Sequence, residues 1–196
     1  MRSIILLHGA IGAKDQLEPL AKELSSLGYK TYSFNFSGHG DTPYKNEFGI
    51  KQFALELDQF FAGNNLVKPD VFGYSMGGYI ALYLASQQLE RLGKIITLGT
   101  KFHWDPVIAQ GEAKMMDTAI IKEKIPKFAA ALEKRHGDGW ELLMKKTAAI
   151  MIDLGNDNLL NAKTFSQIKS KVLIGLAVFL EIVGILVTMK VMKLDV

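Results

Sequence analysis

The chain contains no cysteine, and this absence excludes several kinds of chemistry. Without thiol groups it has no disulfides, no zinc–thiolate sites and no cysteine nucleophile. A strong net charge is also missing, because 23 lysines and arginines face 20 acidic residues and leave only +3. A charge so small and dispersed gives no indication of nucleic-acid binding. The sequence also lacks internal repeats and low-complexity segments, and its 196 residues suffice for one domain with a sizeable core.

The start of the chain lacks the layout of a signal peptide, because residues 1–3 lead straight into an apolar run at 4–7. We therefore expect a cytoplasmic protein. Up to residue 100, apolar segments typical of buried strands alternate with helical segments. The expected strands lie at about 3–7, 30–35, 69–73 and 94–99, and the expected helices at about 15–27, 50–62 and 77–91. This alternation predicts an α/β fold, with a mostly parallel sheet and helices on both of its faces.

The most informative stretch is the pentapeptide GYSMG at residues 73–77, which Gly78 follows at once. It separates a short apolar strand from an apolar helical run, so a single serine occupies the sharp turn between them. Gly73, Gly77 and Gly78 bring no side chain to the point where strand and helix approach each other. Ser75 is then expected to project its hydroxyl above the sheet edge, beside the partial positive charge of a helix N-terminus. The pattern predicts a nucleophilic serine.

Two other turns support this interpretation by their position. Residues 8–12, HGAIG, follow the first strand, and a GHG turn at 38–40 follows the second. In this order the three motifs make residues 3–104 resemble the α/β-hydrolase superfamily. The resemblance implies that the amides of Ala10 and Met76 donate hydrogen bonds to an oxyanion. It also implies that His8 and Gly9 shape the first turn and that His39 is a structural loop histidine.

The resemblance further implies an activity. Relatives of this kind cleave carboxylic esters and related acyl bonds through an acyl-enzyme, so the expected partner is a small ester or acyl substrate attached to Ser75. No metal and no organic cofactor is expected.

Residues 101–167 show helical patterns only, at Pro106–Ile120, Ile125–Arg135 and Gly139–Leu154. The superfamily carries a helical cap, or lid, at this point. The resemblance therefore divides one domain into a core at 1–100 and 168–196 and a cap insertion at 101–167. Candidate pocket walls in the cap are aromatic residues and methionines, although such residues more often fill a core. They are Phe102, Trp104, Met115, Met116 and Trp140.

His103 and Asp105 are close in the sequence and suggest a catalytic pair. Residues two apart on a helix do not face each other, so we give this pair little catalytic weight.

The chain departs from the superfamily pattern near its end. Ile168–Leu176 is predicted to be the strand that re-enters the sheet, but no aspartate follows it until Asp195, and no histidine lies beyond His136. The triad acid and histidine are therefore unknown, and loss of triad members costs roughly four to six decades in rate. We expect an impaired serine hydrolase. The alternative is a catalytically silent protein of this fold that binds a small apolar ligand or a partner.

The segment after this strand allows further interpretations. We expect a truncation or a reading-frame change shortly after Leu176. Residues 172–189 contain a single charge, Glu181, and just reach the length of a membrane span. A glutamate near the middle of a span costs several kcal/mol. A strand at Lys171–Leu176 is favoured over a membrane-tethered form, because the alternation of strands and helices predicts a strand there. The sequence predicts neither a structure for 177–196 nor an oligomeric state.

Overall fold

The structure is a computed structural model and describes residues 2–175. Five parallel strands form one sheet with the order β2-β1-β3-β4-β5. The strands are β1 (Ser3–Leu7), β2 (Lys30–Ser33), β3 (Asp70–Tyr74), β4 (Ile95–Leu98) and β5 (Val172–Gly175). The α/β fold with a parallel sheet is confirmed. The strand expected after residue 168 is also present, and it pairs with β4 through Leu173 and Ile96.

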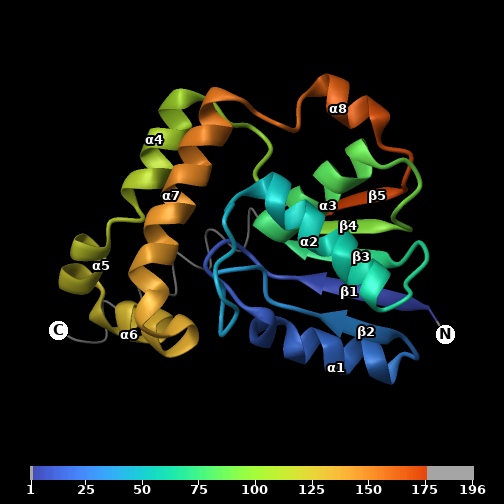
Figure 1. Cartoon of the computed structure of the whole chain (residues 1–196), viewed down its shortest axis with the longest axis horizontal. Coiled ribbons are helices and arrows are strands. Elements are labelled where there is room, and N and C mark those ends of the chain that lie inside the picture. Colours follow the sequence, from blue (N-terminus) through green and yellow to red (C-terminus); the bar gives the residue numbers. More distant parts are fainter. Residues whose placement is uncertain (1, 176–196) are drawn as a thin grey trace.

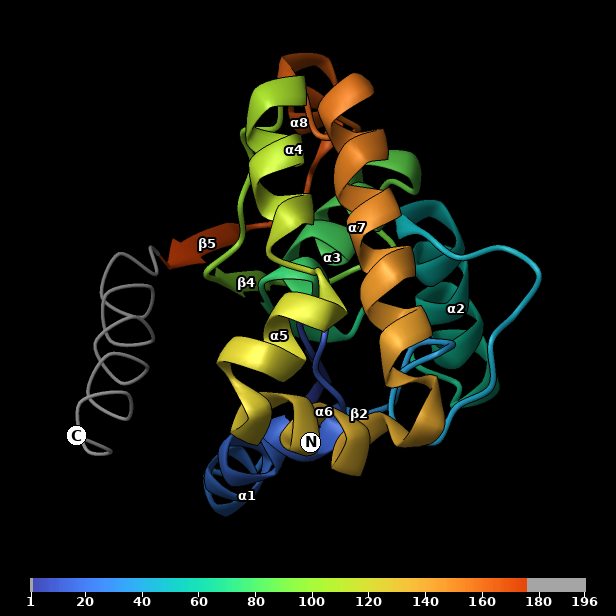
Figure 2. The same cartoon turned by 90° about the vertical axis from the view of Figure 1, so that its left-hand side faces the viewer.

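Helices connect every pair of consecutive strands. The first three are α1 (Glu18–Ser26), which follows the short 3-10 helix η1 (Lys14–Leu17), α2 (Ile50–Gly63) and α3 (Met76–Gln87). Between β4 and β5 lie α4 (Pro106–Lys114), α5 (Thr118–Lys124), α6 (Pro126–His136), the 3-10 helix η2 (Gly137–Gly139), α7 (Trp140–Asn156) and α8 (Ala162–Gln167). Figures 1 and 2 show α4 to α7 grouped at the side of the sheet where the strands end.

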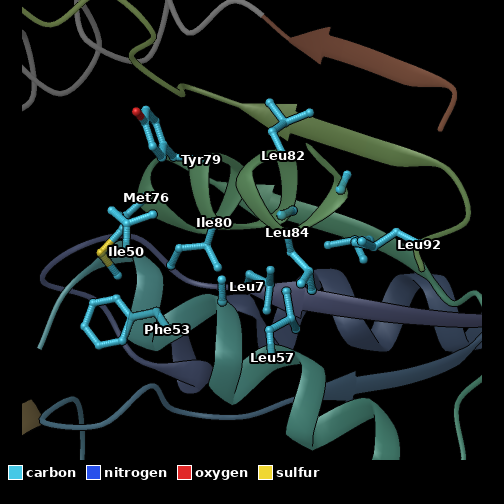
Figure 3. Close-up of a cluster of buried hydrophobic side chains, with 14 of the residues drawn as sticks. Leu7, Ile50, Phe53, Leu57, Met76, Tyr79, Ile80, Leu82, Leu84 and Leu92 are labelled. Carbon is cyan, nitrogen blue, oxygen red and sulfur yellow. The ribbon is translucent and has the colours of Figure 1, made fainter. Parts of the chain in front are cut away.

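The main core lies between the sheet and the helices α2 and α3. Phe53, Leu57 and Phe61 of α2 recur every four residues, so they share one helix face, and all three are fully buried. Figure 3 shows Leu57 pointing toward Leu84 of α3 and the ring of Phe53 lying near Met76 of the same helix. This packing holds α3, and therefore the turn that precedes it, firmly against the sheet.

Several boundaries differ from those expected. The stretch expected to be one helix over 106–120 is two helices, because the Asp117 side chain accepts hydrogen bonds from the amides of Ala119 and Ile120 and begins α5. The third helix ends at Gln87 rather than 91. Helix α8 was not predicted, although Asn161 and Thr164 form a capping box at its start.

Strand β5 is the last strand of the sheet over the described residues. Its apolar side chains are poorly covered, and Leu173 is 64% exposed. Residues 176–196 lie outside the described part of the chain, and so do the expected change after Leu176 and most of the candidate span at 172–189. That span begins in a strand, β5, rather than in a helix.

Candidate active site

Ser75 occupies the junction between β3 and α3 in an unusual backbone conformation. Its φ of 50° and ψ of −115° are rarely adopted by a residue with a side chain, and such strain is typical of functional sites. Hydrogen bonds hold the conformation, since the Ser75 amide donates to the Leu98 carbonyl at 2.8 Å and the Thr100 hydroxyl donates to the Ser75 carbonyl at 2.9 Å. The backbone of Ser75 is therefore held both by β3, which it follows, and by residues at the end of β4.

The glycines around Ser75 permit a very close approach of backbone to backbone. A Cβ atom at Gly73 would lie 2.3 Å from the Gly78 nitrogen, and one at Gly77 would lie 2.5 Å from the Leu7 carbonyl oxygen. Backbone atoms cannot move aside as a flexible side chain can. Strand β3, helix α3 and the end of β1 thus meet at distances that only glycine allows.

The turn at residues 8–12 lies directly beside Ser75. A Cβ atom at Gly9 would be 3.4 Å from the Ser75 Cβ, and the turn is closed by a hydrogen bond from the Gly12 amide to the Gly9 carbonyl. The amides of Ala10 and Met76 donate to no acceptor within residues 2–175. Both amides belong to residues that line the same cavity as Ser75.

This cavity has a volume of about 150 Å³ and collects residues from distant parts of the chain. Ala10, Ser75 and Met76 lie on one side. The remaining walls come from α2, α4, α7 and the segment after β4, and they include Ile50, Lys101, Trp104, Glu112, Thr147, Ile150, Met151 and Leu154. Residues 101–167 therefore contribute about half of the residues that line the cavity.

Of the five candidate pocket walls, Trp104 alone lines this cavity. Phe102 packs against Phe165, with ring centroids 5.5 Å apart, and Met115 is 59% exposed. Met116 and Trp140 belong to a separate hydrophobic cluster with Ile121, Ala129, Leu132 and Met144. These four side chains fill cores or face solvent, as methionines and aromatics on helices generally do.

The charged pair in the cavity wall is not expected from the sequence. The Lys101 ammonium forms a salt bridge with the Glu112 carboxylate, and the Lys101 Nζ lies 5.4 Å from the centroid of the Trp104 ring. The two partners come from different segments, 11 residues apart, so no short motif predicts the contact. Paired in this way, the ammonium has no lone pair with which to accept the Ser75 proton.

Three of the four histidines are held by main-chain hydrogen bonds. In His8, Nδ1 donates to the Gly9 carbonyl at 2.8 Å and Nε2 accepts from the Phe36 amide at 3.2 Å. His39 makes its shorter contact, 2.7 Å, from Nε2 to the Ala10 carbonyl. Both side chains are almost completely buried, and both hold the turn beside Ser75 in shape. His8 and His39 therefore occupy the structural positions expected of them.

His136, at the end of α6, links two turns of the N-terminal half. Its Nδ1 accepts a hydrogen bond from the Gly40 amide at 2.9 Å, and its Nε2 donates to the Ile11 carbonyl at 3.0 Å. The ring centroids of His136 and His39 are 6.2 Å apart. No sequence motif predicts this contact, because its partners are 96 and 125 residues away.

Burial keeps these imidazoles neutral. It is the main reason that the pKa of His8 falls to about 3, and the nearby His39 adds to the effect. Burial also lowers the pKa of His39 and that of His136. None of the three lines the cavity.

The expectation that His103 and Asp105 do not face each other is wrong. They precede α4 instead of lying in a helix, and His103 Nε2 lies 3.3 Å from Asp105 Oδ2. The pair is nevertheless away from the cavity, because His103 is 80% exposed and neither residue lines it. Asp105 instead begins α4, where its side chain accepts from the amides of Val107 and Ile108.

The hydroxyl of Ser75 has no hydrogen-bond partner among the described side chains. The buried carboxylate of Glu56 is not a partner of this hydroxyl either. Its oxygens accept hydrogen bonds from the Ser37 amide at 2.9 Å and from the Ser37 hydroxyl at 2.7 Å. Residues 2–175 also contain no group of three or more histidine or acidic side chains able to hold a metal ion. Over the same residues, no helix has both the length and the apolar character needed to cross a bilayer.

Comparisons with known proteins agree with this geometry. A family model described as alpha/beta hydrolase fold matches residues 2–171. The sn-1-specific diacylglycerol lipase ABHD11 of Mus musculus is 27% identical over 97 residues, which are 49% of this chain and 32% of that protein. Ethanol acetyltransferase 2 of Hanseniaspora uvarum is 32% identical over 96 residues, which are 47% of this chain and 28% of that protein. The matched region thus spans about a third or less of these relatives.

A solved structure of an esterase from Exiguobacterium antarcticum superposes with a TM-score of 0.70 at 16% identity and covers 89% of this chain and 72% of that one. At this identity the likeness concerns the fold alone. The family match, in contrast, extends from the first strand to the residue before β5 and includes the turn at Ser75. On that evidence the chain belongs to the α/β-hydrolase fold family.

Proposed function

We propose that Ser75 accepts an acyl group from a carboxylic ester or a related acyl compound, with the Ala10 and Met76 amides binding the oxyanion. The observation that carries this proposal is the strained serine in a cavity beside two amides that have no other acceptor in residues 2–175. The names of two relatives, a lipase and an acetyltransferase, support an acyl substrate.

The reaction begins when the Ser75 oxygen attacks the carbonyl carbon of the substrate. The carbonyl oxygen becomes an oxyanion, which accepts hydrogen bonds from the two amides. When the intermediate collapses, the carbon–oxygen bond to the alcohol breaks, the alcohol takes up a proton, and the acyl group remains on Ser75. Water then releases the acid and restores the hydroxyl.

Within residues 2–175 no side chain accepts a hydrogen bond from the Ser75 hydroxyl, so in this proposal its proton passes to water. Removal of the base from a serine triad leaves an enhancement of roughly 10³ to 10⁴ over water, from the oxyanion donors and binding alone. We therefore infer that this chain binds an ester far better than it hydrolyses it. The helices of 101–167 act in this proposal as a lid over the core formed by 1–100 and 168–196, because their residues line the same cavity as Ser75.

Turnover of p-nitrophenyl acetate by the purified chain tests this proposal. We expect slow release of p-nitrophenol, and we expect Ser75→Ala to change the total rate little. Ser86→Ala is a matched control, because Ser86 lies on the same helix and its hydroxyl donates to the Tyr83 carbonyl, away from the cavity. Efficient turnover that Ser75→Ala abolishes would show that a base reaches the site, and the impaired mechanism would then be wrong.

The second candidate is a catalytically silent protein that binds a small apolar ligand in the same cavity. It is favoured by the main-chain hydrogen bonds that occupy His8, His39 and His136. The two candidates differ in whether Ser75 ever carries an acyl group.

A further inference from the structure

The cavity at Ser75 is small, and its walls leave an apolar interior. Apolar side chains of Ile50, Trp104, Ile150, Met151 and Leu154 form much of its surface. Tyr79 adds only its ring, because its hydroxyl donates to the Asn158 side chain at 2.7 Å and accepts from the Leu160 amide at 3.0 Å.

The charges in the wall cancel. Lys101 and Glu112 are the two ionic groups that line the cavity, and they form a salt bridge with each other. A ligand carboxylate would have to compete with Glu112 for the ammonium and would leave one carboxylate unpaired in a partly desolvated place. The cavity therefore favours an uncharged group.

The volume of the cavity limits how much of a ligand's alkyl chain can be buried in it. A cavity of about 150 Å³ with apolar walls holds one molecule the size of benzene, which has about six carbons. We propose that the Ser75 cavity takes an uncharged aliphatic acyl group and buries no more than about six of its carbons, counted from the carbonyl. This proposal rests on the proposed function, since it takes the carbonyl to lie at Ser75.

Methyl ketones of increasing chain length measure this limit without any chemical step. Their carbonyl imitates that of an ester, and their alkyl chain occupies the position of the acyl chain. Trp104 lines the cavity, whereas the other tryptophan, Trp140, lies in the separate cluster, so ligand binding can be followed by tryptophan fluorescence. Trp104→Phe should remove the signal.

The expected result is a break in the dependence of affinity on chain length. Each added methylene should lower Kd about fourfold while it is buried, and beyond about six carbons each further methylene should change Kd less than about twofold. Hexanoate should bind at least about tenfold more weakly than the ketone of the same chain length, because a charged group meets the salt bridge.

Substitutions of one wall residue, Met151, should change the chain length at which the break in affinity occurs. Met151→Ala removes three heavy atoms from the wall and should shift the break to chains about three carbons longer. Met144→Ala is the matched control, because Met144 lies on the same helix but packs in the separate cluster, so the break should stay in place. Met151→Trp fills the cavity and should shift the break to shorter chains, which keeps the test decisive if Met151→Ala fails to fold.

An affinity that continues to rise about fourfold per methylene well past six carbons would overturn the proposal, and so would an absence of ketone binding. A break that ignores both Met151 substitutions would also overturn it. These outcomes are separate from those of the ester assay. A clear break without acylation of Ser75 would leave the short-chain site in place and reject only the acyl-transfer function.

Discussion

At the scale of single residues, two histidines hold successive carbonyls of the turn beside Ser75. His39 contacts the Ala10 carbonyl and His136 donates to the Ile11 carbonyl, so the two peptide groups that follow Ala10 are held in place. The Ala10 amide belongs to the preceding peptide group, whose Gly9 carbonyl accepts from His8 Nδ1 and from the Gly12 amide. An amide held in this way costs no reorganisation when an oxyanion forms. His136 comes from α6, which makes the position of the turn depend on the helices of 101–167.

Replacement of His136 should therefore reduce stability. His136→Ala leaves the Gly40 amide and the Ile11 carbonyl without partners, and each such partly buried group costs about 1 to 3 kcal/mol. We expect a loss of about 3 kcal/mol in the free energy of unfolding, measured by urea titration. His103→Ala, at an exposed histidine, should change it by less than about 0.5 kcal/mol. Equal effects of the two substitutions would contradict the assigned role.

The buried neutral histidines also predict a pH dependence. Their folded-state pKa values are depressed, so the unfolded chain binds more protons once the pH falls below its own histidine pKa of about 6.5. Their contribution to stability is thus complete above about pH 6.5 and is lost as the pH falls toward 3, the region of the His8 pKa.

For His8 alone the expected loss is about 2 kcal/mol at pH 5, because that pH is 1.5 units below the unfolded value. Urea titrations at pH 7.5, 6 and 5 measure it, and His8→Gln should reduce proton uptake on unfolding by about one. Stability that stays level, or increases, from pH 7.5 to 5 would contradict the neutral state of these imidazoles.

At the scale of elements, the crossing of β3 and α3 depends on glycine. Gly73→Ala places a Cβ atom against the backbone of Gly78, which cannot give way, so we expect a loss of more than about 3 kcal/mol. Gly111→Ala is the matched control. Gly111 lies inside α4 with open space around it, and alanine there should stabilise by about 0.5 to 1 kcal/mol. Thermal unfolding of both variants provides the comparison, and a mild effect at Gly73 would contradict the close approach.

The elements show how far the sequence predicts the fold. β1 is a nearly continuous apolar run, and every residue after Ser3 is buried, so its sequence alone predicts a strand covered on both faces. The start of α5 depends on one side chain, Asp117, within a stretch whose helical pattern continues across it. Periodicity predicts that a helix is present, but a capping hydrogen bond decides where it begins.

The candidate site likewise has one part that the sequence predicts and another that it does not. The turn at Ser75 is encoded within a few adjacent residues, because its glycines are required locally, and the sequence therefore predicts it. The cavity walls are not encoded locally. Met151 and Glu112 meet the serine only after α7 and α4 have packed together, and no short pattern contains that information.

At the scale of the whole molecule, the site lies between two parts of the chain. The sheet positions Ser75 and the two amides, and the segment between β4 and β5 supplies about half of the residues that line the cavity. The central claim is that this arrangement makes Ser75 an acyl acceptor although residues 2–175 offer it no base.

Peptide mass mapping after long incubation with p-nitrophenyl acetate tests that claim most directly. The account predicts one slowly formed acetyl group on the peptide that contains Ser75. The group should be absent in Ser75→Ala and present in Ser86→Ala. Acetylation confined to lysine side chains, with the Ser75 peptide unmodified in the folded protein, would contradict it.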